Sequence, residues 1–342
     1  MSAIVTAAVR GETLTAASWH EFWDALADRR VDRAEAAALF AALSARTLEA
    51  GTAAGFLSSL AERRATPPVR LPSAVNIVGT GGGPATVNIS TAAAIVAAAA
   101  GVKVLKTGSR AGSGTVGSID ILEKLGIPLA RSAEEAVAQL DRTGITFAGQ
   151  FVYPSELPRL ARTVVPLGLR AIGGFVNTLG PFLANVSTGA QLTGISDPAA
   201  LPAFRELASA TPDTRIWLCH NDLGADELLS LTTSHVHDNR LGEFTVDPDA
   251  LGLGGGELAD LGRPAGDDHA AGFLALLAGQ APAAAVATVC LNAAALAVLG
   301  GVAPGFAEGV RAARVAIEDG AALDLAKRLA ARTPLPTGGR HG

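Results

Sequence analysis

Short apolar runs alternate with longer serine-initiated runs along the second fifth of the chain and just beyond. The short runs have the length and apolar composition of buried strands, and they lie at 75–78, 102–106 and 145–148. The longer runs end at or just before a glycine, as helices commonly do, and they lie at 90–100, 118–125 and 132–144. This alternation predicts an α/β fold with a largely parallel sheet and helices on its faces.

The region before this alternation is predicted to be helical. Residues 19–64 repeat apolar side chains at three- and four-residue spacing, and Asp32 with Glu35 forms a helix-capping pattern. Prolines at 67, 68 and 72 then mark a linker. Later in the chain, residues 215–219 read as a strand and residues 281–300 as an apolar, mostly buried helix.

Composition excludes several classes of protein. The 342 residues are 49% hydrophobic and 17% charged, which is typical of a globular chain of roughly two domains. The net charge is −5 and no basic tract is present, so we expect no nucleic-acid partner. Charged residues interrupt the N-terminal apolar stretch, and Cys219 and Cys290 are too few for a disulfide framework. We expect a soluble cytoplasmic protein without a membrane partner.

A bare loop follows the first predicted strand. Residues 76–91 read NIVGTGGGPATVNIST, with Gly79, Gly81, Gly82 and Gly83 ahead of a predicted helix. Missing β-carbons let an anion approach backbone N–H groups, and a helix N-terminus favours negative charge. The spacing fits neither a Walker loop nor a GxGxxG fingerprint. An ordinary glycine-rich turn followed by a helix cap remains the alternative.

A second glycine- and hydroxyl-rich loop follows the next strand, in VKVLKTGSRAGSGTVGSID at 102–120. Lys106 and Arg110 lie in this stretch, and two of the four lysines in the chain, Lys103 and Lys106, fall in the strand. Loops at neighbouring ends of parallel strands lie at one edge of the sheet. The two loops therefore predict a cradle for a ligand with more than one phosphate group.

Several motifs together resemble the anthranilate phosphoribosyltransferase family. They are GTGG, NIST, K-x-G-x-R and GS-x-D-x-L-x-x-LG, followed by HNDLGADE at 220–227, TVDPDALGL at 245–253 and LNAAAL at 291–296. Their order along the chain is more specific than any single motif. The resemblance extends from about Asp32 to the C-terminal region.

The resemblance implies a fold of the nucleoside phosphorylase and phosphoribosyltransferase type. A small helical domain would comprise residues 1–70, with a contribution from about 171–190. Residues 71–170 and 191–342 would form a larger α/β domain with a central, mostly parallel sheet that binds phosphoribosyl pyrophosphate. It also implies a homodimer through the helical domains and Mg²⁺ as cofactor.

The resemblance assigns roles to individual residues. Catalysis would involve Lys106 and Arg110, and the metal would be held by Asp226, Glu227 and Ser90. The phosphoribosyl pyrophosphate donor would contact Gly79, Thr80, Gly81, Gly82, Asn88, Ser90, Thr91, Lys106, Ser113 and Ser118. The acceptor would contact Thr107, Ser109, Tyr153, Arg162 and Asn177. Cations and N–H donors suit a reaction that releases a highly charged pyrophosphate, and hard carboxylate oxygens suit Mg²⁺.

The acceptor side departs from the family pattern. Thr107 and Ser109 stand where the family has His and Asn, and Tyr153-Pro154 replaces a His-Pro pair. The arginine expected to bind the carboxylate of anthranilate falls at Thr163, so Arg159, Arg162 or Arg170 is its candidate replacement. Tyr153 either stacks on an aromatic ring or fills the core. These substitutions favour a related aromatic acceptor over anthranilate itself.

Two further departures concern the donor loop and the N-terminal region. Gly83 replaces the acid that usually ends GTGGD. The stretch before GTGG is short, as though one helix of the small domain were missing, which puts the usual dimer in doubt.

Three alternatives remain at this level. One is a nucleoside phosphorylase, which needs only inorganic phosphate and no magnesium pair at Asp226 and Glu227. Another is a non-catalytic homologue that binds a ligand or nucleic acid. The third is ordinary tryptophan-pathway activity with a rearranged acceptor pocket. The sequence does not distinguish N- from C-ribosylation.

Overall fold

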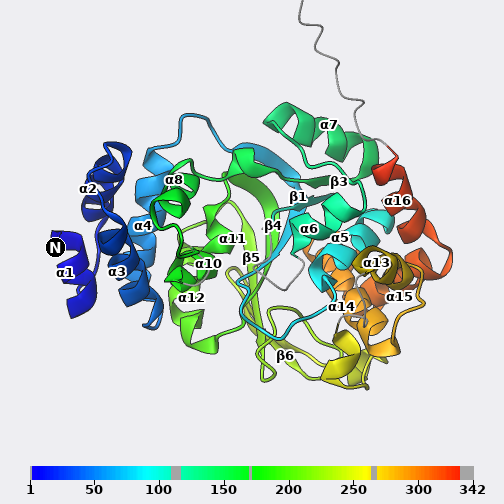
Figure 1. The fold of residues 1–342 in the computed structure, drawn as a ribbon. Helices are drawn as coiled ribbons and strands as arrows, with labels where there is room; N and C mark the ends of the chain where they lie inside the picture. Colours follow the sequence, from blue (N-terminus) through cyan, green and yellow to red (C-terminus); the bar gives the residue numbers. More distant parts are fainter. Residues whose placement is uncertain (1, 109–116, 169–171, 263–267, 332–342) are drawn as a thin grey trace, which may run out of the picture. The chain divides into compact units, whose positions relative to one another are not determined.

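The structure, a computed structural model, describes residues 2–108, 117–168, 172–262 and 268–331 (Figure 1). It divides into two compact units. The first unit comprises residues 1–73, 78–84 and 150–247, and the second comprises 74–77, 85–149 and 248–342. The chain crosses between the units within its first strand. The domain boundaries expected from the family resemblance remain a prediction.

One sheet of seven strands has the order β3-β2-β1-β4-β5-β6-β7. The pairs β1–β2, β2–β3 and β4–β5 are parallel, whereas β5–β6 and β6–β7 are antiparallel. The strands are β1 (Val69–Gly79), β2 (Val104–Lys106), β3 (Ile145–Phe147), β4 (Val186–Gly194), β5 (Arg215–Asn221), β6 (Ser234–Asp238) and β7 (Gly242–Val246). The predicted α/β class with a mostly parallel sheet is therefore confirmed.

Four N-terminal helices belong to the first unit: α1 (Ala3–Arg10), α2 (Ala16–Ala27), α3 (Arg33–Ser44) and α4 (Ala50–Glu62). The capping prediction is confirmed, because the Asp32 side chain accepts a 2.8 Å hydrogen bond from the backbone N–H of Glu35. Helix α1 was not predicted. Its apolar positions Ile4, Val5 and Ala8 are buried against the other helices. A helix of eight residues is stabilised mainly by such tertiary packing, which the sequence does not show.

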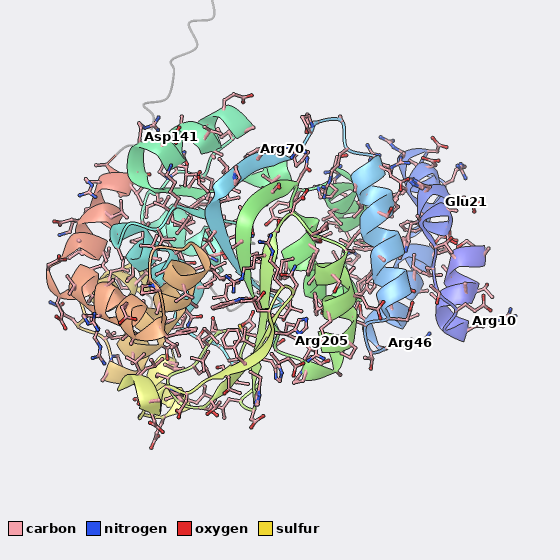
Figure 2. All side chains as sticks on the ribbon, turned by 180° about the vertical axis from the view of Figure 1, so that it is seen from behind. Arg10, Glu21, Arg46, Arg70, Asp141 and Arg205 are labelled. Carbon is pink, nitrogen blue, oxygen red and sulfur yellow. The ribbon has the colours of Figure 1, made fainter. Side chains whose placement is uncertain are left out.

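Aromatic side chains fill the interior of this helical cluster. Trp19 stacks on Trp23 and on Phe175, with ring centroids 5.8 Å and 6.1 Å apart, and meets Phe56 edge-on at 4.8 Å. Trp19 and Trp23 are fully buried. Charged side chains of the same helices, such as Arg10 on α1 and Glu21 on α2, are exposed (Figure 2). This division of apolar and charged faces accounts for the helical periodicity of the sequence.

The remaining helices of the first unit pack on this cluster (Figure 1). They are α8 (Glu156–Thr163), α10 (Gly174–Thr178), α11 (Gly180–Leu183) and α12 (Leu201–Ser209), with 3₁₀ turns at Gln150–Val152 and Pro198–Ala200. Ser44 ties α3 to α10, because its hydroxyl donates to Ile172 O at 2.9 Å and accepts from Phe175 N at 3.0 Å. Segments distant in the sequence thus share one core.

The second unit packs its helices around two small-residue helices, α5 (Ile89–Ala99) and α14 (Ala283–Leu299). Alanines dominate both helices, so their backbones approach closely and nearly every side chain is buried. The other helices are α6 (Ser118–Lys124), α7 (Ala133–Thr143), α13 (His269–Leu277), α15 (Phe306–Glu318) and α16 (Ala321–Ala330), with 3₁₀ turns at Asp249–Leu251 and Leu258–Leu261. The predicted helices at 90–100, 118–125, 132–144 and 281–300 are present.

Within the described residues, no helix combines the length and the hydropathy that a membrane span requires.

Candidate active site

The bare loop predicted after the first strand is present in the first unit. It leaves β1 at Gly79 and turns through Gly81 and Gly82, whose φ angles of +70° and +87° suit glycine rather than residues with a β-carbon. Thr80 holds the loop to the end of β4, because its N–H donates to Gly194 O at 2.9 Å and its hydroxyl accepts from Ser196 N at 3.1 Å. A fixed loop of this kind presents main-chain groups without side chains.

The Asp226 carboxylate lies directly against this loop. Its Oδ2 accepts a 2.7 Å hydrogen bond from the N–H of Gly81. A β-carbon built on Gly79 would lie 1.9 Å from the same oxygen, and one built on Gly194 would lie 1.6 Å from the backbone O of Asp226. Gly79 and Gly194 are therefore glycines because the acidic turn occupies the space of their side chains.

Asn221, at the end of β5, fixes the turn that carries Asp226 and Glu227. Its Oδ1 accepts from the backbone N–H groups of Leu223 and Ala225 at 3.1 Å and 3.3 Å. Its Nδ2 donates to Ala225 O at 3.2 Å and Glu227 O at 2.9 Å. The buried side-chain amide of Asn221 thus supplies hydrogen-bond partners to backbone N–H and C=O groups of this turn, which lies outside the strands. Sequence reasoning missed Asn221, although it lies within the HNDLGADE motif.

The carboxylates of this turn act on a neighbouring thiol. Burial, together with the negative charges of Asp226 and Glu227, raises the pKa of Cys219 far above its usual value. Cys219 is therefore an inert, protonated core residue.

The turn also explains why position 83 carries no acid. A β-carbon on Gly83 would lie 2.5 Å from Gly224 O and 3.2 Å from Ala225 Cα. Backbone atoms cannot yield as a flexible side chain does, so an aspartate here requires the acidic turn to shift. The absence of an acid at position 83 is thus explained by the close packing of Gly83 against the backbone of Gly224 and Ala225.

In the second unit, Lys106 is a buried lysine at the end of β2. It is only 4% exposed. Its Nζ donates to Ile77 O at 3.1 Å, Ser90 Oγ at 3.3 Å and Thr107 O at 3.5 Å. These three acceptors are neutral oxygens, and together they orient the ammonium. A buried cation whose position is fixed in this way is suited to binding an anion.

The N-terminus of α5 places further predicted residues in the second unit with Lys106. Ser90 contacts Lys106 directly, and Asn88 has a left-handed φ of +36° just before the helix. Thr91 is fully buried, and its Oγ1 has no hydrogen-bond partner within the described residues. An unsatisfied buried hydroxyl is costly, by ~1–3 kcal/mol. Its position supports the phosphate contact, which remains a prediction.

Thr107 is buried and bonded to Asn76, a residue that sequence reasoning did not select. Asn76 Nδ2 lies 3.0 Å from Thr107 Oγ1, and Asn76 Oδ1 accepts from Thr107 N at 3.1 Å. Thr107 is 1% exposed and Asn76 is 0% exposed. Asn76 could have been selected from the sequence because it is the polar residue within the apolar run VNIV. The acceptor role predicted for Thr107 remains a prediction.

Ser118, the first residue of α6, lies against Gly108 in the turn that follows β2. A β-carbon on Gly108 would be 2.2 Å from Ser118 Oγ, so glycine is required there unless that hydroxyl moves. Ser109, Arg110, Ser113 and Arg170 lie outside the described residues. Their predicted roles remain predictions.

The other predicted acceptor residues belong to the first unit. Tyr153 is half-buried against the helical core, whereas Arg162 on α8 and Asn177 on α10 are exposed. Thr163, where the family's arginine was expected, uses its hydroxyl to bond Arg159 O at 3.1 Å within its own helix. Thr163 therefore offers no carboxylate clamp, and Arg159 and Arg162 remain the described candidates.

The donor atoms near the glycine loop suit magnesium. Asp226 and Glu227 provide adjacent carboxylates, and Mg²⁺ commonly takes one or two carboxylates and completes its shell with water and phosphate oxygens. Within the described ranges, no group of three or more His, Cys, Asp or Glu side chains is placed to hold a metal ion. Ser90, the third predicted ligand, belongs to the second unit.

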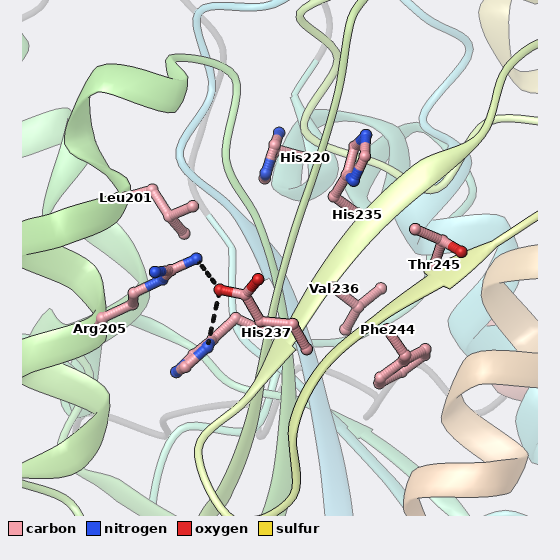
Figure 3. Close-up of a pocket in the computed structure, with 9 residues that line it drawn as sticks. Leu201, Arg205, His220, His235, Val236, His237, Phe244 and Thr245 are labelled. Atoms are coloured by element: carbon pink, nitrogen blue, oxygen red, sulfur yellow. Dashed lines mark hydrogen bonds and ion pairs between the residues drawn. The ribbon is translucent and has the colours of Figure 1, made fainter.

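A separate hollow of about 300 Å³ lies in the first unit between α12 and the strands β5 to β7 (Figure 3). His220 and His235, a cross-strand pair, stack with ring centroids 5.2 Å apart. Glu243 pairs with Arg205, and its Oε1 is 3.9 Å from His237 Nδ1. His235 and His237, both on β6, line this hollow.

The class of the protein follows from comparing this architecture with known families. Residues 71–323 match the sequence model of the glycosyl transferase family, a/b domain. The match contains the glycine loop, the buried lysine and the acidic turn.

Individual relatives define the family more closely. The chain is 39% identical over 308 residues to anthranilate phosphoribosyltransferase 2 of Streptomyces coelicolor, covering 87% of this chain and 89% of the relative. It is 33% identical over 328 residues to the anthranilate phosphoribosyltransferase of Methylobacterium nodulans, covering 94% and 95%. The chain belongs to the anthranilate phosphoribosyltransferase family.

Solved structures agree. The anthranilate phosphoribosyltransferase of Thermus thermophilus has a TM-score of 0.80 and 31% identity, covering 96% of this chain and 99% of that one. The Saccharomyces cerevisiae enzyme, solved with phosphoribosyl pyrophosphate and Mg, has a TM-score of 0.76 at 20% identity, covering 97% and 99%. The latter shows a shared fold. The resemblance read from the motifs is confirmed.

Proposed function

We propose that the protein transfers the 5-phosphoribosyl group of phosphoribosyl pyrophosphate to an aromatic acceptor and releases pyrophosphate. Family membership establishes an enzyme of this class. The observation that carries the proposal is the buried Lys106 ammonium, oriented by three neutral oxygens in a chain whose relatives are named for this reaction. Ser90, which bonds Lys106, and the unpartnered hydroxyl of Thr91 support a phosphate contact beside it.

The chemistry requires stabilisation of a leaving group more than a nucleophile on the protein. As the anomeric C–O bond breaks, its electron pair goes to pyrophosphate, and the sugar gains oxocarbenium character. The acceptor atom, nitrogen or carbon, forms the new bond to the anomeric carbon, and the proton it carried is released to solvent. Lys106 and the N–H groups of the glycine loop are suited to stabilise the phosphate charge, because they are fixed before the reaction.

Magnesium fits this proposal through Asp226 and Glu227. When bound there, Mg²⁺ would neutralise charge on the departing pyrophosphate. The Asp226 oxygen is already directed at the loop by Gly81 N–H, so the carboxylate is oriented without the ion.

The relatives are named for anthranilate, and we propose anthranilate or a related aromatic compound as the acceptor. The departures at Thr107, Tyr153 and Thr163 support a related compound. Arg159 or Arg162 would take the place of the missing carboxylate-binding arginine.

Two further points remain proposals. A homodimer follows from the family resemblance, and a cytoplasmic location follows from the expected role in small-molecule synthesis.

Turnover tests the function directly. The purified chain is incubated with phosphoribosyl pyrophosphate, Mg²⁺ and a panel of anthranilate and related aromatic acids and amines, and pyrophosphate release is followed. We expect release with at least one acceptor, reduced at least ~100-fold in Lys106→Ala and Asp226→Ala because leaving-group stabilisation is removed.

Exposed residues provide matched controls. Lys124→Ala and Asp141→Asn should retain wild-type turnover, since both side chains are exposed. No release with any acceptor, together with no donor binding by calorimetry, would reject the proposal. Magnesium-independent cleavage of a nucleoside by inorganic phosphate would instead establish the phosphorylase alternative.

A further inference from the structure

We infer that Asn76 is a positioning residue that fixes the turn carrying Lys106 and thereby sets the affinity for the phosphorylated donor. This inference rests on the proposed function. It concerns only residues of the second unit.

Asn76 continues the pairing of two strands beyond the point where their ladder ends. In the β1–β2 register Asn76 lies opposite Leu105, and β2 ends one residue later at Lys106. The next residue, Thr107, is 1% exposed and follows the last strand position. Asn76 Oδ1 accepts its N–H at 3.1 Å, so a side-chain amide replaces the strand partner.

The Thr107 side chain is bonded by the same amide. Asn76 Nδ2 lies 3.0 Å from Thr107 Oγ1, and Asn76 Oδ1 lies 3.2 Å from that hydroxyl. Thr107 is therefore bonded through both its main chain and its side chain. An apolar residue would suit the neighbours of Asn76 in the buried run VNIV better, so the polar residue is retained at a desolvation cost that these hydrogen bonds offset.

The position of the Lys106 ammonium depends on two carbonyl groups next to the Asn76–Thr107 hydrogen bonds. Its Nζ donates to the carbonyl oxygens of Ile77 and Thr107, at 3.1 Å and 3.5 Å. Ile77 follows Asn76 in β1, and Thr107 is bonded by Asn76. Movement of the Asn76–Thr107 pair would therefore displace both carbonyls. Gly108, packed against Ser118 Oγ, limits the turn on its other side.

Donor binding by calorimetry tests this role, with phosphoribosyl pyrophosphate and Mg²⁺ as the titrant. We expect Asn76→Ala to raise Kd by about 10- to 100-fold, because a displacement of the ammonium weakens a contact that depends on geometry. The double variant Asn76→Ala/Lys106→Ala should bind no more weakly than Lys106→Ala alone, since Asn76 acts through Lys106.

Conservative variants separate positioning from general stability. Thr107→Ser keeps the main-chain N–H and the hydroxyl that bond Asn76, whereas Thr107→Val loses the hydroxyl. Thr107→Val should therefore bind donor about 3- to 10-fold more weakly than Thr107→Ser. Asn292→Ala is the matched control, because Asn292 is a buried asparagine of the same unit, is 1% exposed and bonds Thr288 O at 2.8 Å. It should reduce thermal stability without changing donor affinity.

The outcomes are distinct from those of the proposed function. If the wild type neither binds nor turns over the donor, the proposed function is rejected. If the wild type binds it and Asn76→Ala binds equally well, or if the effects of Asn76→Ala and Lys106→Ala are additive, the inference is overturned. Should Asn76→Ala fail to fold, the comparison of Thr107→Val with Thr107→Ser decides the matter in the same way.

Discussion

At the scale of single residues, several glycines in this protein are required because neighbouring atoms leave no space for a side chain. Gly79 and Gly194 are both packed against Asp226, and Gly83 is packed against the main chain at Gly224. At each of these positions a β-carbon would clash with a different atom of the same acidic turn. The glycine-rich motif is therefore required as much by the turn beneath it as by the anion it is proposed to bind.

Gly79→Ala tests this interpretation. The new methyl group would occupy the position of Asp226 Oδ2, so the carboxylate must move and the Gly81 N–H must lose its partner. We expect at least a ~100-fold loss of kcat/KM for the donor, measured by pyrophosphate release at saturating acceptor.

Gly180→Ala is the control for this substitution. A β-carbon at Gly180 meets no atom within 4 Å. Its activity should match that of the wild type. Wild-type activity in Gly79→Ala would show that the position of Asp226 is not needed for catalysis.

At the scale of elements, the β6–β7 hairpin and α12 enclose a group of imidazoles. Burial and the neighbouring His235 lower the pKa of His220 below its usual value. Asp222 and Glu243 oppose this shift, and Arg205 adds to it. His237, on the same strand as His235, lines the same hollow. The folded protein thus keeps His220 neutral at a pH where the unfolded chain would protonate it.

The sign of the resulting pH dependence follows. Because the pKa of His220 is lower in the folded state, the unfolded state binds more protons as the pH falls. The free energy of unfolding should be constant above about pH 7.5 and should decrease as the pH falls through the ordinary histidine value near ~6.5. Denaturant melts between about pH 8 and pH 5 measure it.

His220→Gln should flatten this dependence, since it removes the titrating ring. His269→Gln, outside the hollow, should leave it unchanged. An identical decrease in wild type and His220→Gln would contradict the assignment.

At the scale of the whole molecule, candidate donor-binding residues occur in both compact units. The glycine loop and Asp226 belong to the first unit, and Lys106, Ser90 and Thr91 belong to the second. A ligand that binds only the folded chain stabilises it by mass action. Thermal unfolding therefore reports binding even where turnover is slow.

We expect phosphoribosyl pyrophosphate with Mg²⁺ to raise Tm, with a stabilisation of ~2.7 kcal/mol at a ligand concentration of about 100 Kd. Chelation of the metal should remove most of this increase, because the charge of the pyrophosphate would face Asp226 and Glu227 uncompensated. Asp226→Asn should weaken the effect of the metal, and Asp141→Asn should not. An equal increase of Tm with and without chelator would contradict a role for magnesium.

The sequence by itself determined the family and the alternation of strands and helices in residues 75–148. Local hydrophobic periodicity, serine caps and closing glycines depend on near neighbours, so the strands and helices of residues 75–148 could be predicted. Motif order identified the family because several short patterns recur together. Gly79, Lys106 and Asp226 were selected as candidate site residues in this way.

Only the tertiary structure decided what these residues touch. Asn76 and Thr107 are 31 residues apart, and Gly81 and Asp226 are 145 apart, so no local pattern could join them. The same holds for the burial of α1 and for the hollow lined by His220 and His235, which lie on different strands. Contacts of this kind depend on strand order and on packing across the sheet, and a linear sequence displays neither.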